Sequence, residues 1–309
     1  MYIYFYIIYP FFQVMKFFLL DWSWFLYRAY YAFPPFIDAN GHNMNVVYGF
    51  VRMILKIIAE RPDYFVITWD SPVKTHRHEM YEDYKATRKK MEDDFKYQIP
   101  FVVELVEKLG LAHLVAPGFE ADDILASLVA AHKHTPDLSL YVYSADKDLK
   151  QLVWPSTYCV DPMKQVTSTV ESFTKEFGFA PQHIVDYLSL LWDASDNIPG
   201  VSGIGPKKAS DLVCKYGDIE NIYAHVQELS RELQEKLTAG QEDALFSKEL
   251  IKLHVIPELL DQNIEDFALH ADFAKWKEIL VNEYHFKTME KALDDIKKKF
   301  FMPVQSSLF

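Results

Sequence analysis

The sequence has 309 residues, of which 50% are hydrophobic and 25% charged, a composition that suits one large folded domain or two and excludes a disordered chain. Its two cysteines, Cys159 and Cys214, lie far apart without metal-ligand spacing, which excludes a disulfide framework and a thiolate zinc site and indicates a reducing, cytoplasmic location. The net charge of −12 would argue against a nucleic-acid partner if the charge were evenly spread. Whether the protein can bind nucleic acid therefore depends on how the acidic and basic residues are distributed along the chain.

Residues 1–20 are the one membrane-like segment. They are near the lower length limit for a spanning helix, Pro10 interrupts them, and they lack the early positive charge and the small-residue cleavage site of a secretory signal. Met15 opens a stretch that reads as a first β-strand passing into a helix. We therefore expect translation to start at Met15, residues 1–14 to be a dispensable extension, and no stable membrane association. A membrane anchor is the alternative.

Short apolar runs then alternate with helical patterns. Residues 64–70 (YFVITWD) and 138–148 (LSLYVYSADKD) are rich in β-branched and aromatic residues, which is typical of strands. Helical patterns lie between them at residues 46–59, 101–109 and 121–131. This alternation predicts an α/β fold with a mostly parallel central sheet flanked by helices.

Acidic residues recur where the predicted strands end. Asp21 and Asp70 follow the first two strands, and Asp146 and Asp148 follow the third. Because the ligand crevice of a parallel sheet lies beyond the carboxyl ends of its strands, we expect these acids to face one crevice. The same set includes Glu120, Asp122 and Asp123 at the start of a helix, and Asp193 and Asp196 at a helix-to-loop junction.

Electrostatic repulsion favours a metal-binding role for this set. The favourable effect of a helix dipole is worth about 0.3–1 kcal/mol per acid, which accounts for one or two of them. Two carboxylates about 4 Å apart repel by about 4 kcal/mol at an effective dielectric near 20. The summed repulsion among all of these acids would therefore exceed the free energy of unfolding of a typical domain, about 5–15 kcal/mol, unless the acids are protonated or neutralised by cations. Oxygen ligands without His or Cys select Mg²⁺ or Mn²⁺, and two such ions suit phosphodiester hydrolysis.

Basic residues gather just after Asp70, in the segment KTHRHEMYEDYKATRKKMEDDFK at residues 74–96. Helical spacing would place Tyr81, Lys85 and Arg88 on one face, suited to phosphate contact and base stacking. The alternative is a solvated helix of mixed charge. We expect a flexible basic segment at which a nucleic-acid strand would enter the crevice.

The stretch PGVSGIGPKKA is the helix-hairpin-helix signature, which indicates sequence-independent duplex binding. Its glycines allow a tight turn with exposed backbone N–H groups, and Pro206 suits the first turn of the helix that follows. The start of that helix would bind phosphate, and two lysines add positive charge. The residues concerned are Gly200, Gly203, Gly205, Lys207 and Lys208. The hairpin is also our candidate site for a K⁺ ion.

These motifs, in this order from about residue 15 to residue 260, resemble the 5′-3′ exonuclease and flap endonuclease family, and in particular the exonuclease domain at the front of bacterial DNA polymerase I. The landmarks are FLYRAYYA, VYGF, RHEMYEDYKATR, GFEADDILASL, SADKDLKQL and SDNIPGVSGIGPKKA. No polymerase module follows, so we expect the free-standing form. The resemblance implies a PIN/resolvase-like nuclease domain at residues 15–180 with a helical arch at about 74–97, a helical H3TH domain at 181–270, and a helical C-terminal segment at 271–309.

The resemblance also implies roles for individual residues. The first metal ion would be held by Asp21, Asp70, Glu120, Asp122 and Asp123, and the second by Asp146, Asp148, Asp193 and Asp196. A capping role at the start of its helix would suit Asp123 equally well. Lys85 and Arg88 match the family's basic pair at the scissile phosphate, and Asp122 is a third catalytic candidate. Tyr81 and Tyr84 lie beside this pair, and Arg77 upstream of it, as candidate substrate contacts.

The implied reaction is metal-dependent hydrolysis that releases a 5′-phosphate end, in replication and repair. The expected partners are branched, nicked or 5′-flapped DNA and RNA–DNA hybrid, bound by a monomer. Trp22 and Trp192 depart from the small residues usual in the family, and we interpret both as packing adjustments rather than substrate-stacking platforms. The alternatives are a non-catalytic DNA-binding protein on the same fold, which should lack several metal ligands, and a PIN-type ribonuclease, which should lack the hairpin.

The chain ends in QSSLF, which resembles the Q-x-x-L-F peptide that docks on the bacterial sliding clamp. Gln305 would supply the polar anchor, and Leu308 and Phe309 would fill an apolar pocket. The alternative is that these terminal apolar residues fold back onto the core.

Overall fold

The computed structural model describes residues 14–38 and 41–301, and its centre is a six-stranded sheet. The strand order is β3-β2-β1-β4-β5-β6, and neighbours are parallel except for β5 and β6. The strands are β1 (Met15–Asp21), β2 (Tyr64–Trp69), β3 (His113–Val115), β4 (Leu138–Tyr143), β5 (Thr157–Asp161) and β6 (Val166–Ser168). This arrangement confirms the predicted α/β fold.

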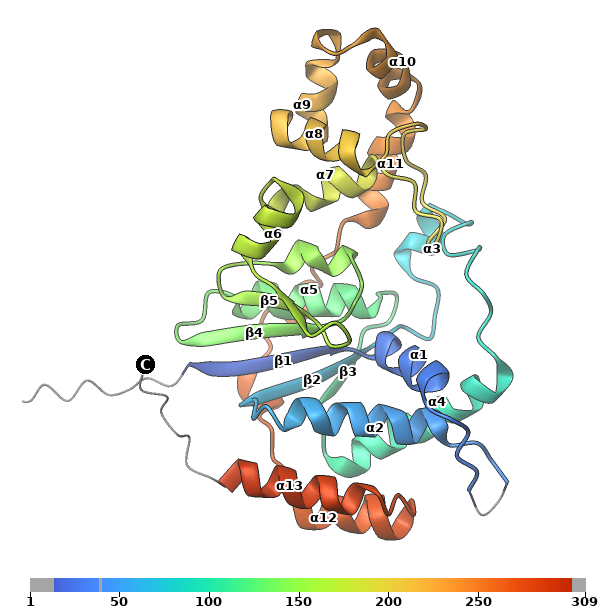
Figure 1. The fold of residues 1–309 in the computed structure, drawn as a ribbon, viewed down its shortest axis with the longest axis vertical. Helices are drawn as coiled ribbons and strands as arrows, with labels where there is room; N and C mark the ends of the chain where they lie inside the picture. The colour runs from blue at the N-terminus through green and yellow to red at the C-terminus, as the bar shows by residue number, and fades with distance from the viewer. Residues whose placement is uncertain (1–13, 39–40, 302–309) are drawn as a thin grey trace, which may run out of the picture.

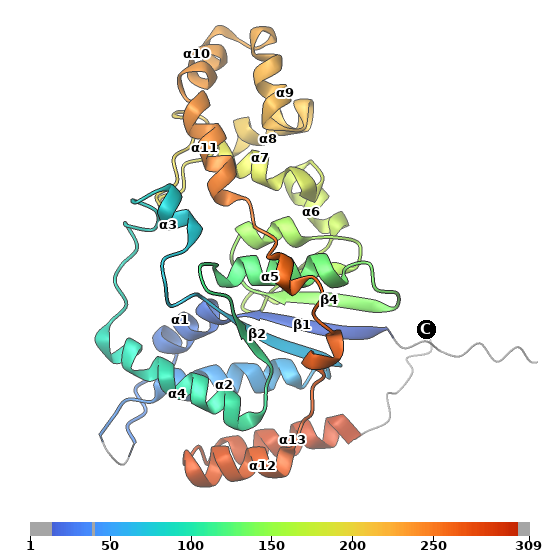
Figure 2. The same cartoon turned by 180° about the vertical axis from the view of Figure 1, so that it is seen from behind.

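Helices cover both faces of the sheet (Figures 1 and 2). One face carries α5 (Ala121–His132), and the other carries α1 (Trp22–Ala32), α2 (Asn45–Ile58) and α4 (Asp93–Leu109). Because successive side chains of a strand point to opposite faces, Phe17 and Leu19 of β1 pack in the cluster with α5, whereas Phe18 and Leu20 pack with α1, α2 and α4. The continuous apolar run before Asp21 is therefore buried on both sides, as a central parallel strand requires.

The parallel register brings the carboxyl ends of the central strands to one edge. Asp21 lies opposite Thr68 of β2, and Leu20 lies opposite Tyr143 of β4. The acids that follow these strands are thereby collected at that edge, beside the first turn of α5.

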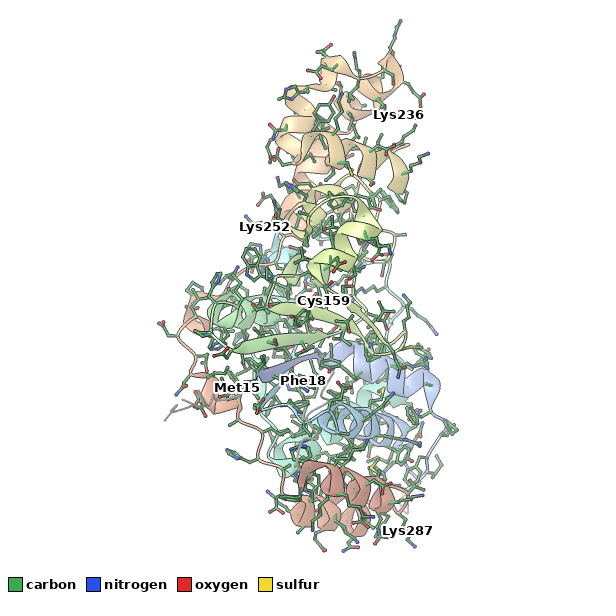
Figure 3. The ribbon with its side chains drawn as sticks, turned by 60° about the vertical axis from the view of Figure 1, so that its left-hand side comes forward. Met15, Phe18, Cys159, Lys236, Lys252 and Lys287 are labelled. Carbon is green, nitrogen blue, oxygen red and sulfur yellow. The ribbon has the colours of Figure 1, made fainter. Side chains whose placement is uncertain are left out.

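A helical subdomain with its own apolar core extends beyond α5. Its helices are α6 (Val170–Phe177), α7 (Ile184–Ser189), α8 (Pro206–Tyr216), α9 (Ile219–Ala224), α10 (Arg231–Ala239) and α11 (Gln241–Ile251). The molecule is elongated: Lys236 lies near the end of this subdomain and Lys287 at the opposite end, with Phe18 and Cys159 of the sheet between them (Figure 3).

After α11 the chain returns along the α5 side and crosses to the other face of the sheet. It ends in α12 (Phe273–Lys277) and α13 (Met289–Phe301), which pack in the same core as α2 and α4. The indole N–H of Trp276 donates to the carbonyl oxygen of Leu109 at 2.8 Å, which ties α12 to the end of α4.

The basic segment at residues 74–97 differs from the prediction. Its only helix before α4 is α3 (His76–Met80), within the described residues. The backbone becomes extended at Tyr81, with φ −144°, and Lys85 has a positive φ of 59°. The prediction that Tyr81, Lys85 and Arg88 lie on one face of a helix is therefore wrong. Tyr81 and Tyr84 pack instead in the apolar core of the helical subdomain.

No described helix is both long and apolar enough to cross a bilayer. Residues 1–13 and the predicted clamp peptide with Gln305, Leu308 and Phe309 lie outside the described residues.

Candidate active site

Asp21 is held at the carboxyl edge of the sheet by hydroxyl and amide donors. It caps α1, accepting the N–H of Ser23 at 3.1 Å and the Ser23 hydroxyl at 2.9 Å. Its other oxygen accepts the hydroxyl of Ser144, directly after β4, at 2.8 Å. Burial, together with the neighbouring charge of Asp70, raises the pKa of Asp21 to about 6.

Asp70 and Asp122 complete the acidic group around Asp21. Asp70 accepts the N–H of Ala121 at 2.9 Å, so the end of β2 is tied to the start of α5. Burial, followed by the charges of Asp146 and Asp21, raises the pKa of Asp122 well above its usual value. Burial likewise raises the pKa of Asp70, so that three carboxylates with raised pKa values lie at this edge of the sheet.

Asp148, Asp193 and Asp196 form a second acidic group. One oxygen from each carboxylate lies within 4.8 Å of the other two. Oδ1 of Asp148 is buried and has no hydrogen-bond partner among the described residues, and burial with the charge of Asp146 raises the Asp148 pKa to about 8. A charge from Asp196 also raises the pKa of Asp146, so the second group adjoins the first through Asp146.

The basic segment lies directly on these acids. Nζ of Lys85 contacts Glu120 at 2.7 Å, and its backbone N–H donates to the carbonyl oxygen of Asp196 at 2.9 Å. Arg88 donates twice to Oδ1 of Asp196, at 2.6 and 2.9 Å, while its side chain remains 44% exposed. The predicted pair Lys85 and Arg88 is therefore brought to the acidic site, with Arg88 still accessible.

Arg77 is placed differently from the prediction, and Asp123 takes the capping position that the sequence had left open. Arg77 is 2% exposed, and its guanidinium donates to both oxygens of Asp123 at 2.8 Å and to Glu120 at 3.0 Å. Asp123 is 0% exposed and also accepts the backbone N–H groups of Glu120 and His254. This geometry favours a capping and positioning role for Asp123 over metal ligation, and it gives Arg77 no path to substrate.

Burial raises the pKa of Glu120, but Lys85 and then Arg77 outweigh this and hold its pKa below the usual value. The Tyr84 hydroxyl donates to the same carboxylate at 3.1 Å. Glu120 is thus already neutralised by protein cations, unlike Asp122 and Asp148.

The two tyrosines predicted to contact substrate point into the protein. Tyr84 is buried, and Tyr81 packs edge-on against Phe246 with ring centroids 5.5 Å apart. Both anchor the basic segment to the helical subdomain, so base stacking on either ring is not supported by this arrangement.

The hairpin has the predicted turn geometry. Pro206 is the first residue of α8, and Gly203 has a positive φ of 77°. At Gly200 a Cβ would collide with the backbone carbonyl of Leu191, so only glycine fits there. Gly205 caps α8; Lys207 is exposed, and Lys208 pairs with Glu232 at 3.2 Å.

The two departures from the family pattern have different environments. Trp22 packs against the sheet core beside Trp69, with ring centroids 5.2 Å apart, in agreement with a packing role. Trp192 is 64% exposed, so the packing role predicted for it is wrong.

Sequence reasoning missed two residues of the site. Ser144 binds Asp21, and Lys147 contacts Asp193 at 2.7 Å. Both belong to the stretch SADKD, in which only the acids were singled out. A serine and a lysine between clustered acids are the signal that could have found them.

The donor set fits divalent metal ions. It consists of carboxylate oxygens, the ligands preferred by Mg²⁺ and Mn²⁺, and it includes the unpartnered buried oxygen of Asp148. Burial and then the charges of neighbouring acids raise the pKa values of Asp21, Asp122 and Asp148, and a bound cation would oppose both effects.

Comparisons with known proteins agree with this geometry. The family model of the 5′-3′ exonuclease N-terminal resolvase-like domain matches residues 16–178, and that of the 5′-3′ exonuclease C-terminal SAM fold matches residues 179–275. The 5′-3′ exonuclease of Aquifex aeolicus (strain VF5) is 38% identical over 294 residues, covering 94% of this chain and 99% of the relative. Thermostable DNA polymerase I of Thermus thermophilus is 36% identical over 257 residues, covering 83% of this chain but 30% of the polymerase.

Two solved structures share the fold. The bacteriophage T5 flap endonuclease, in a pseudo-enzyme-product complex with DNA and metal ions, has a TM-score of 0.64 and 16% identity, covering 93% of this chain and 100% of its own. The catalytic core of Rad2 in complex with DNA substrate has a TM-score of 0.61 and 17% identity, covering 92% and 93%.

The role of Asp123 can be separated from that of a metal ligand by stability. Replacing Asp123 with Ala leaves the buried Arg77 guanidinium short of its main partner and should lower the free energy of unfolding in EDTA by about 3–5 kcal/mol. Asp146→Ala removes a carboxylate that its neighbours destabilise and should cost little under the same conditions. Urea unfolding measures both; equal stability of the two variants would contradict the positioning role.

The raised pKa values predict an unusual dependence of stability on pH. Between about pH 6.5 and pH 8.5 without metal, native molecules retain protons at Asp148 that unfolded chains have lost, so stability should fall by up to about 1.4 kcal/mol per pH unit from this group. Mg²⁺ competes with these protons and should therefore raise the melting temperature most at the higher pH. Thermal melts in EDTA and in Mg²⁺ measure this, with Asp148→Asn as the variant of weaker slope; a metal-free melting temperature that rises over this interval would contradict the account.

Proposed function

The chain belongs to the 5′-3′ exonuclease family, and we propose on this basis that it hydrolyses DNA phosphodiester bonds from a 5′ end and cuts 5′ flaps. One observation carries the proposal: the acids around Asp21 adjoin the group formed by Asp148, Asp193 and Asp196, and the accessible Arg88 is bound to this second group. Metal ions on these carboxylates, with a phosphodiester beside Arg88, would provide a site for hydrolysis. Hydrolysis of RNA primers paired with DNA belongs to the same proposal.

We propose Mg²⁺ or Mn²⁺ as the ions. Asp21, Asp70, Asp122 and Asp146 would hold one, and Asp148, Asp193 and Asp196 the other. When bound, such a pair supplies positive charge at the attacking and leaving oxygens of an in-line displacement. The charge of Asp146 acts on Asp122 of the first group and on Asp148 of the second. Loss of Asp146 should therefore weaken metal binding at both groups.

The protein's own side chains orient the phosphate. Arg88 and Lys85 supply positively charged donors at the rim of the acidic groups, and a phosphate approaching there would exchange for their present carboxylate partners. Arg77 acts indirectly, because it holds Glu120 and Asp123 at the start of α5 while Glu120 in turn holds Lys85.

The helical subdomain supports binding of duplex DNA. Its turn presents Gly203 and Gly205 at the start of α8, where backbone N–H groups and Lys207 can contact phosphates without reading bases. K⁺ at this hairpin stays a prediction. Action as a monomer likewise stays a prediction.

We also propose that the terminal QSSLF docks on a sliding clamp, since the pattern pairs a glutamine with two apolar anchors at the chain end. Deletion of Leu308 and Phe309 should abolish capture by purified clamp and leave flap cleavage intact. Equal capture of both forms would overturn this proposal.

Cleavage of a labelled 5′-flap duplex tests the main proposal. Activity should require Mg²⁺ or Mn²⁺, and Asp146→Ala should lower kcat by at least about 100-fold, because losing transition-state charge stabilisation costs about 2.7–4 kcal/mol. The matched control is Asp294→Ala, on the exposed face of α13, which should change kcat little. No cleavage by the wild type, or equal cleavage by wild type and Asp146→Ala, would contradict the proposed function.

A further inference from the structure

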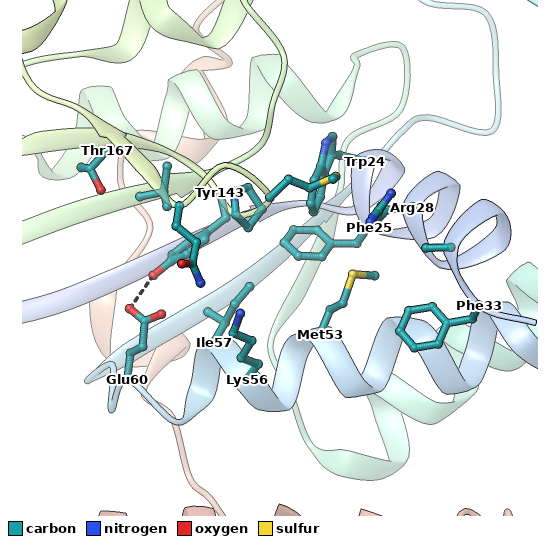
Figure 4. A pocket seen from close by; sticks show the side chains of 15 residues that line it. Trp24, Phe25, Arg28, Phe33, Met53, Lys56, Ile57, Glu60, Tyr143 and Thr167 are labelled. Atoms are coloured by element: carbon teal, nitrogen blue, oxygen red, sulfur yellow. Dashed lines mark hydrogen bonds between the residues drawn. The ribbon is translucent and has the colours of Figure 1, made fainter.

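A second cavity opens beside the acidic site, on the face of the sheet that α1 and α2 cover. Its volume is about 630 Å³. The hairpin of β5 and β6 forms one wall, α2 forms the facing wall, and α1 lies at one end (Figure 4). Neither the acidic groups nor the duplex-binding hairpin accounts for this cavity.

The cavity continues the groove of the metal site. A neighbouring hollow of about 430 Å³ is lined by Asp21, Asp146 and Arg88. Trp24 and Arg28 line both spaces. A strand lying across the acidic site can therefore pass into the second cavity over these two residues of α1.

Part of the lining is aromatic and apolar. Trp24 packs edge-on against Phe25, with ring centroids 4.7 Å apart, and Phe33, Met53 and Met163 extend the apolar surface. Met163 is exposed at the turn of the hairpin. Flat rings and flexible thioethers suit a nucleobase without selecting its identity.

The rest of the lining is polar and positively charged. Arg28 and Lys56 are exposed, and the described residues offer neither side chain a hydrogen bond or an ion pair. The one carboxylate in the lining, Glu60, accepts the Tyr143 hydroxyl at 3.2 Å (Figure 4). These two cations differ from Lys85, Arg88 and Lys147, which are all paired with acids.

We propose that this cavity binds one unpaired nucleotide of the strand that crosses the metal site, with its base against Trp24 and its phosphate between Arg28 and Lys56. The proposal rests on the proposed function. The volume of the cavity lies within the range of about 300–1,000 Å³ that is typical of small-ligand sites. The aromatic surface matches the base of a nucleotide, and the two unpaired cations match its phosphate. A simple anion would make no use of the aromatic surface, and an apolar peptide would make no use of the cations.

Binding of deoxyadenosine monophosphate in EDTA tests the cavity without any contribution from metal-assisted catalysis. Titration calorimetry should show binding to the wild type, and Arg28→Ala/Lys56→Ala should weaken it about tenfold or more, since hydrogen bonds to charged groups are lost. Lys291→Ala/Lys297→Ala removes the same charge from the exposed face of α13 and should bind like the wild type. Trp24→Phe should retain binding and Trp24→Ala should lose it.

Deoxyadenosine, which lacks the phosphate, should bind the wild type and Arg28→Ala/Lys56→Ala equally weakly. Absence of nucleotide binding to the wild type, or equal loss in both double variants, would overturn the proposal.

Steady-state cleavage of a 5′-flap substrate then tests whether the cavity lies on the substrate path. Arg28→Ala/Lys56→Ala should raise KM about tenfold and leave kcat almost unchanged, so that kcat/KM falls about tenfold. Lys291→Ala/Lys297→Ala should match the wild type in both parameters. Nucleotide binding with unchanged KM would overturn the substrate-path proposal. A wild type that binds the nucleotide but cleaves no flap would instead contradict the proposed function, so the two failures are distinguishable.

Discussion

Mutual repulsion among carboxylates at the carboxyl edge of the sheet is the constraint on which the rest of the structure depends. The parallel register collects Asp21, Asp70 and Asp146 there, and α5 adds Asp122. Burial and the neighbouring acids favour protonated carboxylates, since they raise the pKa values of Asp21 and Asp148, and basic side chains lie over other acids of the site. Neutralisation of the site is incomplete, as the unpartnered buried oxygen of Asp148 shows, and the divalent cations that we propose would complete it.

The same basic side chains therefore have two possible partners. Lys85 and Arg88 neutralise Glu120 and Asp196 in the structure, and a phosphate is the competing anion. Metal ions on the acids would reduce the hold of Asp196 on Arg88, so metal binding and phosphate binding should favour each other. The buried ion pair of Arg77 and Asp123 would leave the start of α5 in place during this exchange, because it does not involve Lys85 or Arg88.

Much of the fold and the set of converging acids could be predicted from the sequence, because both follow from short-range patterns. An apolar run ending in an acid specifies a buried strand and a residue at its carboxyl end, as for Asp21 and Asp70. The course of residues 81–88 could not be predicted, because packing of Tyr81 and Tyr84 against a distant subdomain overrides local helical spacing. The structural role of Asp123 and the exposure of Trp192 likewise depend on residues remote in the chain.

Anomalous diffraction from crystals soaked in Mn²⁺ tests the central claim most directly. The account predicts two peaks, one among Asp148, Asp193 and Asp196 and one among Asp21, Asp70, Asp122 and Asp146, with no peak at Asp123. Their separation should be about 3.5–4 Å, the spacing of two-metal sites in phosphodiester enzymes. Crystals that show no Mn²⁺ at these carboxylates, or an ion bound between Asp123 and His254 instead, would contradict it.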